Sequence, residues 1–121
     1  MTSVDKYLDR TYHRRDYNCG HFVADVWRDL TGADISAAVC GLWAPTGQGR
    51  ATLKQLRTFK RLREPVSPCI ALLSPPRGQT HVGIYLRGRI LHIKPAGVSF
   101  DLIEVATLGF AHTRYYECVT D

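Results

Sequence analysis

The chain has 121 residues, of which 45% are hydrophobic and 22% are charged, and its net charge at pH 7 is +5. This composition is ordinary for a globular protein, and a chain of this length can bury a core without disulfides. The first residues contain no apolar segment of the signal-peptide kind, and no apolar run reaches the length of a membrane span. We therefore expect one domain over residues 1–121, made in the cytoplasm without a signal peptide and with no membrane span.

The four cysteines are widely spaced, at Cys19, Cys40, Cys69 and Cys118. They form no CxxC pair and no zinc-finger pattern, and without an export signal reduced thiols are the default. A mixed metal site is the alternative, built from Cys19, His21, Cys40 and His81. Because metal sites in short domains usually show closely spaced ligand pairs, we expect no metal and no cofactor.

Basic residues gather in two segments, 10–15 and 54–63. Solvated helix faces are the simpler interpretation of both. Attraction to a polyanion, either nucleic acid or an anionic cell-wall polymer, is the alternative. No nucleic-acid-binding motif accompanies the charge, so we do not expect a nucleic-acid partner.

Helix signals dominate the first half of the chain. Apolar residues at helical spacing predict a short helix over 4–12, a longer one over 19–31 and another over 50–62. Asn18 is a good N-cap for the longer helix, and Gly32 is placed to end it. Asp34 is placed to cap a short helical segment through Ala38.

Short apolar runs bounded by turns dominate the second half, and they predict strands at 69–73, 80–86, 90–93, 98–101 and 112–119. Arg87-Gly88-Arg89 predicts a tight hairpin turn, and 104–109 predicts one helical turn. Helices followed by antiparallel strands indicate an α+β domain, with N-terminal helices packed on a C-terminal antiparallel sheet.

Cys19 stands at the predicted start of the longer helix. A thiol there feels the positive end of the helix dipole, which favours the nucleophilic thiolate. The alternative interpretation is a buried cysteine that acts as a small hydrophobe. A catalytic role therefore requires a base elsewhere in the chain.

Two of the five histidines lie in otherwise apolar strands joined by a hairpin, His81 and His92. The others are His13 and His112, in polar contexts, and His21, which points to a different helix face from Cys19. If the turn sets the register, His81 and His92 lie close together on the sheet. A Cys19 nucleophile, a His81 base and an orienting His92 then form a catalytic trio.

Further groups are candidates to contact the substrate. The backbone N–H of Cys19 is placed to form an oxyanion hole, with Tyr7 or Tyr12 as an added donor. Asn18 beside the cysteine is a further candidate. We also predict that Trp43 forms a wall of the cleft, the alternative being an aromatic that anchors its loop.

Three segments together resemble the NlpC family of papain-like cysteine peptidases: Asn18-Cys19-Gly20-His21-Phe22-Val23, Thr80-His81-Val82-Gly83-Ile84-Tyr85-Leu86 and Ile90-Leu91-His92. The H-V-G-I-Y segment is the most specific part of this resemblance, which extends over residues 12–100. Three differences stand beside it. Asn18 replaces the usual aspartate, Gly20-His21 replaces serine-glycine, and Lys94-Pro95 follows the third residue, where small polar residues are common.

The resemblance implies an NlpC-type papain-like fold and a cysteine peptidase or amidase. Its implied substrates are bacterial peptidoglycan stem peptides, cut at a γ-D-glutamyl bond to a diamino acid. Cys19 would be the nucleophile, His81 the base and His92 the third member. The compact length resembles the phage tail-associated branch, which implies a place in the virion tail and other tail proteins as partners.

Three other functions stay open. A structural tail or assembly protein could keep the fold with little activity. A papain-like acyltransferase or deamidase would use the same trio on protein or lipid substrates. A basic nucleic-acid-binding module would instead show salt-sensitive binding to DNA.

Overall fold

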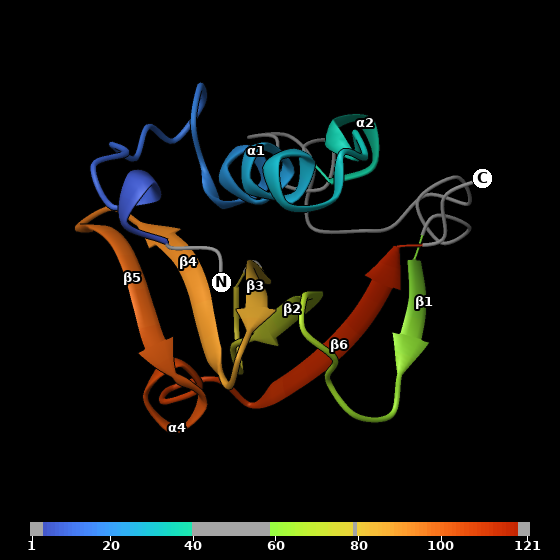
Figure 1. The fold of residues 1–121 in the computed structure, drawn as a ribbon. Helices are drawn as coiled ribbons and strands as arrows, with labels where there is room; N and C mark the ends of the chain where they lie inside the picture. The colour runs from blue at the N-terminus through green and yellow to red at the C-terminus, as the bar shows by residue number, and fades with distance from the viewer. Residues whose placement is uncertain (1–3, 40–58, 79, 119–121) are drawn as a thin grey trace.

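The computed structural model describes residues 4–39, 59–78 and 80–118, and its helical segments lie mainly in the first of these ranges. A 3-10 turn, η1, spans Asp5–Tyr7, and the helix α1 spans Cys19–Thr31. A short helix, α2, follows at Ser36–Val39. Figure 1 shows α1 lying across one face of a curved sheet.

Helix α1 forms where its sequence signals predict it. The side chain of Asn18 accepts hydrogen bonds from the backbone N–H groups of Gly20 and His21, which satisfies donors that the helix itself leaves unpaired. Gly32 ends the helix at φ 81°, a left-handed conformation that glycine adopts without steric cost. Both predicted helix boundaries are therefore confirmed.

The six strands form one antiparallel sheet in the spatial order β1-β6-β2-β3-β4-β5. Their bounds are Phe59–Leu62 for β1, Cys69–Ser74 for β2, His81–Leu86 for β3, Arg89–Lys94 for β4, Gly97–Leu102 for β5 and His112–Cys118 for β6. One further helical turn, α4, spans Ile103–Ala106 between β5 and β6. The α+β class and the antiparallel sheet are confirmed.

The two faces of the sheet pack differently. On one face α1 contacts β3 and β4, and Phe22 and Val23 join Val82, Ile84 and Leu91 in what we call the α1-side core. On the other face a smaller α4-side cluster contains Ala71, Leu73, Ile90 and Ala106. Figure 1 shows α1 and α4 on opposite sides of the sheet.

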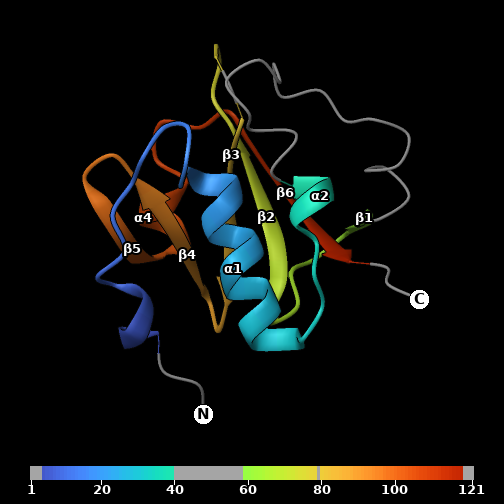
Figure 2. The same cartoon turned by 90° about the horizontal axis from the view of Figure 1, so that it is seen from above.

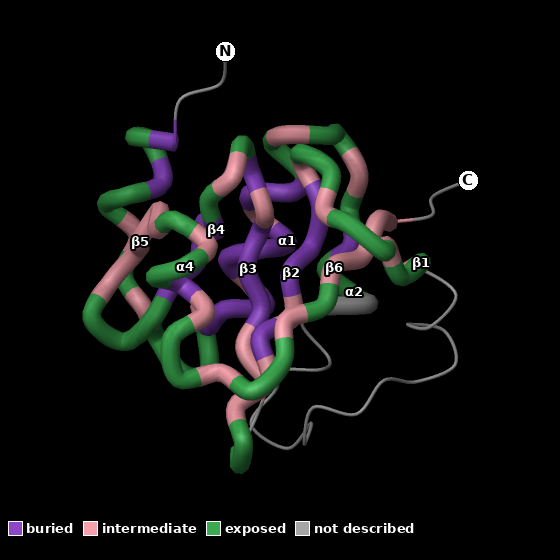
Figure 3. Tube along the Cα trace, turned by 90° about the horizontal axis from the view of Figure 1, so that it is seen from below, coloured by how far each residue is buried: buried purple, intermediate pink, exposed green. Residues whose placement is uncertain are grey.

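Buried residues concentrate in α1 and in the central strands β2, β3 and β4, whereas several loops are exposed, as Figure 3 shows. The edge strand β1 has two exposed basic residues, Lys60 and Arg61, at its centre. Charged residues on an edge strand discourage pairing with a further chain. Across the three described ranges, no helix is long and apolar enough to cross a membrane.

Two helix predictions need correction. Instead of a helix over 4–12, the chain forms only the 3-10 turn η1, whose Tyr7 is buried. Instead of a helix reaching residue 62, Phe59–Leu62 is strand β1, paired with β6. Phe59 and Leu62 are spaced for one helix face, but backbone pairing with Cys118 and Tyr115 gives these residues an extended partner.

The remaining local predictions hold in the described residues. Asp34 accepts from the backbone N–H of Ser36 at the start of α2. Arg87 and Gly88 have φ of 52° and 82°, as a two-residue hairpin turn with two positive φ values requires. The predicted loop over 41–49, its Trp43 and most of the segment 50–58 lie outside the described residues.

Candidate functional site

Cys19 is the first residue of α1 and is buried, with 8% of its surface exposed. It belongs to the α1-side core, together with Phe22 and Val23 of its own helix. Its position at the helix N-terminus places the thiol at the positive end of the helix dipole. The local setting that the sequence predicts for a reactive thiol is therefore present.

His21 completes the cap rather than serving as a base. Its Nδ1 accepts a hydrogen bond from the backbone N–H of Asn18 at 3.1 Å, so that Asn18 and His21 each bond the backbone of the other. Two predicted surface histidines, His13 and His112, are both exposed. His112 begins β6, so His81 and His92 are the two sheet histidines that are not exposed.

The imidazole rings of His81 and His92 are in direct contact, as the predicted register requires. Nε2 of His81 lies 2.9 Å from Nδ1 of His92. His81 is the first residue of β3, and His92 lies in β4, where only 1% of its surface is exposed. The β3–β4 ladder runs from Leu86–Arg89 to Ile84–Leu91, so the two rings lie beyond its end.

A third member, Asp101 of β5, was missed by sequence reasoning. Its Oδ2 lies 2.9 Å from Nε2 of His92. His92 is paired with Ser99 on β5, and Asp101 is two residues further on, on the same face of the strand. The available signal was an acidic residue in a predicted strand, two residues beyond Ser99. The β4–β5 register was needed to place that residue beside His92.

Burial dominates the electrostatics of the histidine pair. It lowers the pKa of His81 from an ordinary 6.5 to about 3, and the nearby His92 and Lys94 lower it further. Burial also lowers the pKa of His92, against the opposing effect of its hydrogen bond to Asp101. Both imidazoles are therefore neutral near pH 7, the form in which a histidine accepts a proton.

An aromatic ring covers His81 on the side of α4. The ring of Phe110 lies nearly parallel to the imidazole, with the two centroids 6.0 Å apart and 13° between the planes. Phe110 packs against the α4-side cluster. This contact contributes to the burial that holds His81 neutral.

Gly83 lets β4 approach β3 beside the histidine pair. A Cβ at this position would lie 2.8 Å from Cγ2 of Ile90 and 3.1 Å from Cβ of His92. It would also lie 3.1 Å from the carbonyl oxygen of Leu91. The glycine of the H-V-G-I-Y segment is therefore a packing requirement of this site.

The cysteine and the histidine pair share one end of the molecule. Helix α1 and strand β3 both begin at the end drawn at the top of Figure 2. Cys19 packs in the α1-side core, whereas the stacking partner of His81 packs in the α4-side cluster. Cys19 therefore packs with the core on one face of the sheet, and His81 packs against an aromatic ring of the cluster on the other face.

The other predicted contact residues have mainly structural partners. The hydroxyl of Tyr7 donates to Asp29 at 3.0 Å, ten residues beyond Cys19 and so about 15 Å along the helix. This places the Tyr7 hydroxyl away from the cysteine. Tyr12 is half-buried against the α1-side core, and the Asn18 amide donates to the carbonyl oxygen of Arg14 in addition to its capping bonds.

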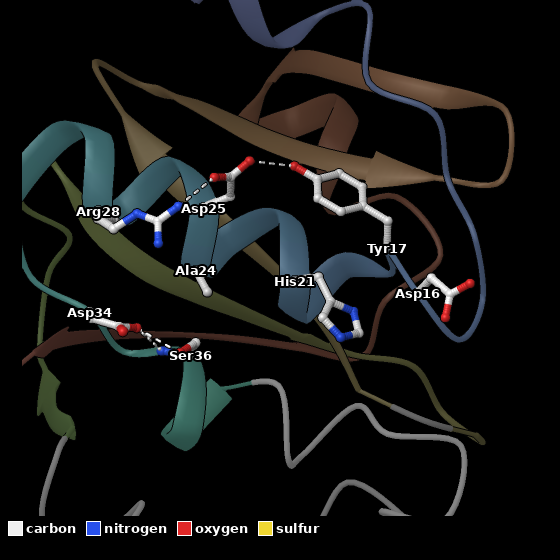
Figure 4. Close-up of a pocket in the computed structure, with 8 residues that line it drawn as sticks. All are labelled: Asp16, Tyr17, His21, Ala24, Asp25, Arg28, Asp34 and Ser36. Carbon is white, nitrogen blue, oxygen red and sulfur yellow. Dashed lines mark hydrogen bonds and ion pairs between the residues drawn. The ribbon is translucent and has the colours of Figure 1, made fainter.

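A polar pocket lies along the outer side of α1, as Figure 4 shows. Its lining includes His21, Asp34 and Ser36, so His21 faces a pocket, although not beside the histidine pair. Asp25 accepts from Tyr17 at 2.8 Å and also binds Arg10. These contacts fasten the N-terminal segment to α1, and burial with the Asp25 contact raises the pKa of Tyr17 to about 12.

The other described thiols are held in the protonated form. Burial raises the pKa of Cys69, and it raises the pKa of Cys118 to about 12. Neither lies at the start of a helix, since Cys69 begins β2 and Cys118 ends β6. Cys40 lies outside the described residues.

Comparisons of the chain with models of known families, with curated proteins and with solved structures return no match.

Proposed function

We propose that this chain is a cysteine peptidase or amidase with an NlpC-type papain-like fold. Cys19 is the nucleophile, His81 the general base and His92 the residue that orients His81. The observation that carries the proposal is the hydrogen bond between the imidazole of His81 and that of the buried His92, at the end of the sheet where α1 begins. A buried chain of polar groups is costly unless fully bonded, and active sites are where such arrangements concentrate.

The proposed reaction has two half-steps. His81 takes the thiol proton of Cys19 as sulfur attacks the carbonyl carbon of the scissile amide, and the imidazolium then protonates the leaving amine. A water molecule next attacks the thioester and gives its proton to His81. The proton passes to the departing thiolate, which releases the carboxylic acid and restores the enzyme. The positive end of α1 stabilises the thiolate.

We propose peptidoglycan stem peptides as the substrate, cut at a γ-D-glutamyl bond to a diamino acid. The support is the resemblance of the three motif segments, since no contact in the structure identifies the substrate. The same resemblance supports a place in a phage tail, where the domain would act during entry with other tail proteins. The polyanion alternative has less support, since Arg61 and Lys60 lie on an edge strand that needs charge for its own protection.

Digestion of purified peptidoglycan tests this function directly. We expect wild-type protein to release stem-peptide fragments that mass spectrometry identifies, and Cys19→Ala to release none. Cys118→Ala is the matched control, because its thiol is also partly buried in the α1-side core and has no proposed role. Equal release by Cys19→Ala and wild type would contradict the nucleophile assignment.

Coupling between Cys19 and His81 has its own test. Iodoacetamide labelling against pH, read at the Cys19 peptide by mass spectrometry, reports the thiolate fraction of that residue alone. We expect His81→Gln to slow labelling of Cys19 near pH 7 by about tenfold or more, because the base that takes its proton is gone. An unchanged labelling rate in His81→Gln would show that the His81 imidazole does not act as the base for the Cys19 thiol.

A structural tail or assembly protein is the second candidate. The observation in its favour is the burial of Cys19 in the α1-side core, which also suits a cysteine that acts as a small hydrophobe. This candidate predicts slow labelling of Cys19 at every pH below the pKa of an ordinary thiol. It also predicts that no peptidoglycan fragments are released from any type of cell wall.

A further inference from the structure

We infer that Asp101 is a positioning residue that acts through two histidines in series, fixing both tautomers so that Nδ1 of His81 is the basic atom. The catalytic part of this inference rests on the proposed function. The tautomers themselves do not, because they follow from the hydrogen bonds that join β3, β4 and β5.

The chain of bonds starts at the carboxylate. An ionised carboxylate only accepts hydrogen bonds, so the contact of 2.9 Å between Asp101 and His92 requires a hydrogen on Nε2 of His92. The opposite tautomer would set a nitrogen lone pair against a carboxylate oxygen. With His92 only 1% exposed, water cannot relieve that repulsion.

The same reasoning passes to the next ring. A neutral imidazole carries one N–H, so Nδ1 of His92 must accept. Its partner is Nε2 of His81 at 2.9 Å, which therefore carries the hydrogen and donates it. Burial lowers the pKa of both rings, in keeping with the neutral forms. The lone pair of His81 is thereby left on Nδ1.

This assignment defines what Asp101 contributes to the reaction. When Nδ1 of His81 accepts the thiol proton, both nitrogens of that ring become donors, and Nε2–H still points at His92. The negative charge of Asp101 then stabilises the new imidazolium through His92. Asparagine could not do this, because it carries no negative charge, and its amide can offer Nε2 of His92 a donor as well as an acceptor.

Nitrogen-15 NMR of the histidine rings in the full chain tests the inference without any substrate. In the wild type at pH 7 we expect both His81 and His92 to show a protonated Nε2 and an unprotonated Nδ1. A protonated Nδ1 on either neutral ring would overturn the inference. Because this measurement uses the wild type, it does not depend on whether a variant folds.

Variants then test the role of the carboxylate. We expect Asp101→Asn to lower peptidoglycan release by about 100-fold or more, the usual contribution of a positioned base. Asp101→Glu restores the carboxylate and should restore release. Ser99→Ala is the control. Ser99 lies on β5, the same strand as Asp101, and pairs with His92 of β4, but it has no proposed role in the chain of hydrogen bonds. Wild-type release by Asp101→Asn would contradict the catalytic part of the inference.

The two proposals fail in different ways. Loss of the expected tautomers with Cys19-dependent release intact would remove Asp101 from the mechanism and leave the peptidase. Wild-type tautomers as expected, with release that does not depend on Cys19, would remove the peptidase and leave Asp101 as the group that fixes both tautomers.

Discussion

Asn18 and His92 are the two polar residues that are buried in the described chain, and they are satisfied in opposite ways. The Asn18 side chain bonds Gly20, His21 and Arg14, all within four residues of itself. The His92 ring bonds His81 and Asp101, which are eleven and nine residues away on two other strands. A local cap forms with its own helix, whereas the histidine contacts exist only when three strands adopt one register.

This difference matters for stability as well as for function. Among the described residues, no buried side-chain nitrogen or oxygen lacks a hydrogen-bond partner. Losing one partner of a buried pair costs the full desolvation of the other, about 1–3 kcal/mol. Two such bonds in series join His81, His92 and Asp101. We therefore expect that disrupting them lowers the free energy of unfolding by more than loss of the cap does.

The largest expected effect is on the pH dependence of stability. His81 has a pKa near 3 in the folded state against an ordinary 6.5, so the unfolded chain binds more protons between these values. The free energy of unfolding should therefore be highest above pH 6.5 and fall by about 1 kcal/mol per pH unit on acidification towards pH 3. Urea unfolding at a series of pH values measures it.

The matched variants decide whether His81 is the source. His81→Gln should flatten the slope below pH 6.5, and His13→Gln, which removes an exposed histidine, is the control. An equal slope in wild type and His81→Gln would show that other groups carry the acid sensitivity.

The next effect is steric and falls on Gly83. We expect Gly83→Ala to lower the free energy of unfolding by about 1–3 kcal/mol, because the added methyl meets Ile90 and the backbone of Leu91. It should also shift the ring signals of His92, whose Cβ lies beside it.

Gly88→Ala is the contrasting variant for that experiment. A Cβ there meets open space, so its cost comes only from the positive φ of 82° at the hairpin turn. It should leave the His92 signals near their wild-type positions. Equal shifts in both variants would mean that the ladder as a whole, rather than contact at Gly83, positions the ring.

The smallest effect should come from the local cap. Asn18→Ala removes the acceptor for Gly20 and His21 and should cost about 1 kcal/mol in thermal or urea unfolding. Asn18→Asp keeps the acceptor and adds a negative charge at the helix N-terminus, so its stability should stay within a few tenths of a kcal/mol. A loss in Asn18→Asp as large as in Asn18→Ala would show that the donated bond to Arg14 matters more.

Prediction from the sequence succeeded where the contacts that determine the structure join residues close together in the sequence. The bounds of α1 follow from Asn18 and Gly32, and the hairpin follows from Arg87-Gly88. Proximity of His81 and His92 followed from that hairpin, because a two-residue turn sets the register of the strands beside it.

Prediction failed where the local structure depends on a partner far away in the sequence. Phe59 and Leu62 are compatible with a helix until β6 supplies an extended edge to pair with. Tyr7 is predicted, with Tyr12 as the alternative, to add a donor to the oxyanion hole, but the packing of η1 directs its hydroxyl to Asp29. Asp101 required the β4–β5 register, which no local turn signal made certain.

The sequence by itself determined the cap and helix that hold Cys19, the strands β2 to β6, and the hairpin that joins the two histidines. Local hydrogen bonds and side-chain periodicity are sufficient for these. Only the tertiary structure decided that Asp101 completes a hydrogen-bonded chain with His92 and His81, and that the central residue His92 is buried. Burial and strand register depend on residues far apart in the chain, and together they set which nitrogen of each ring holds the proton.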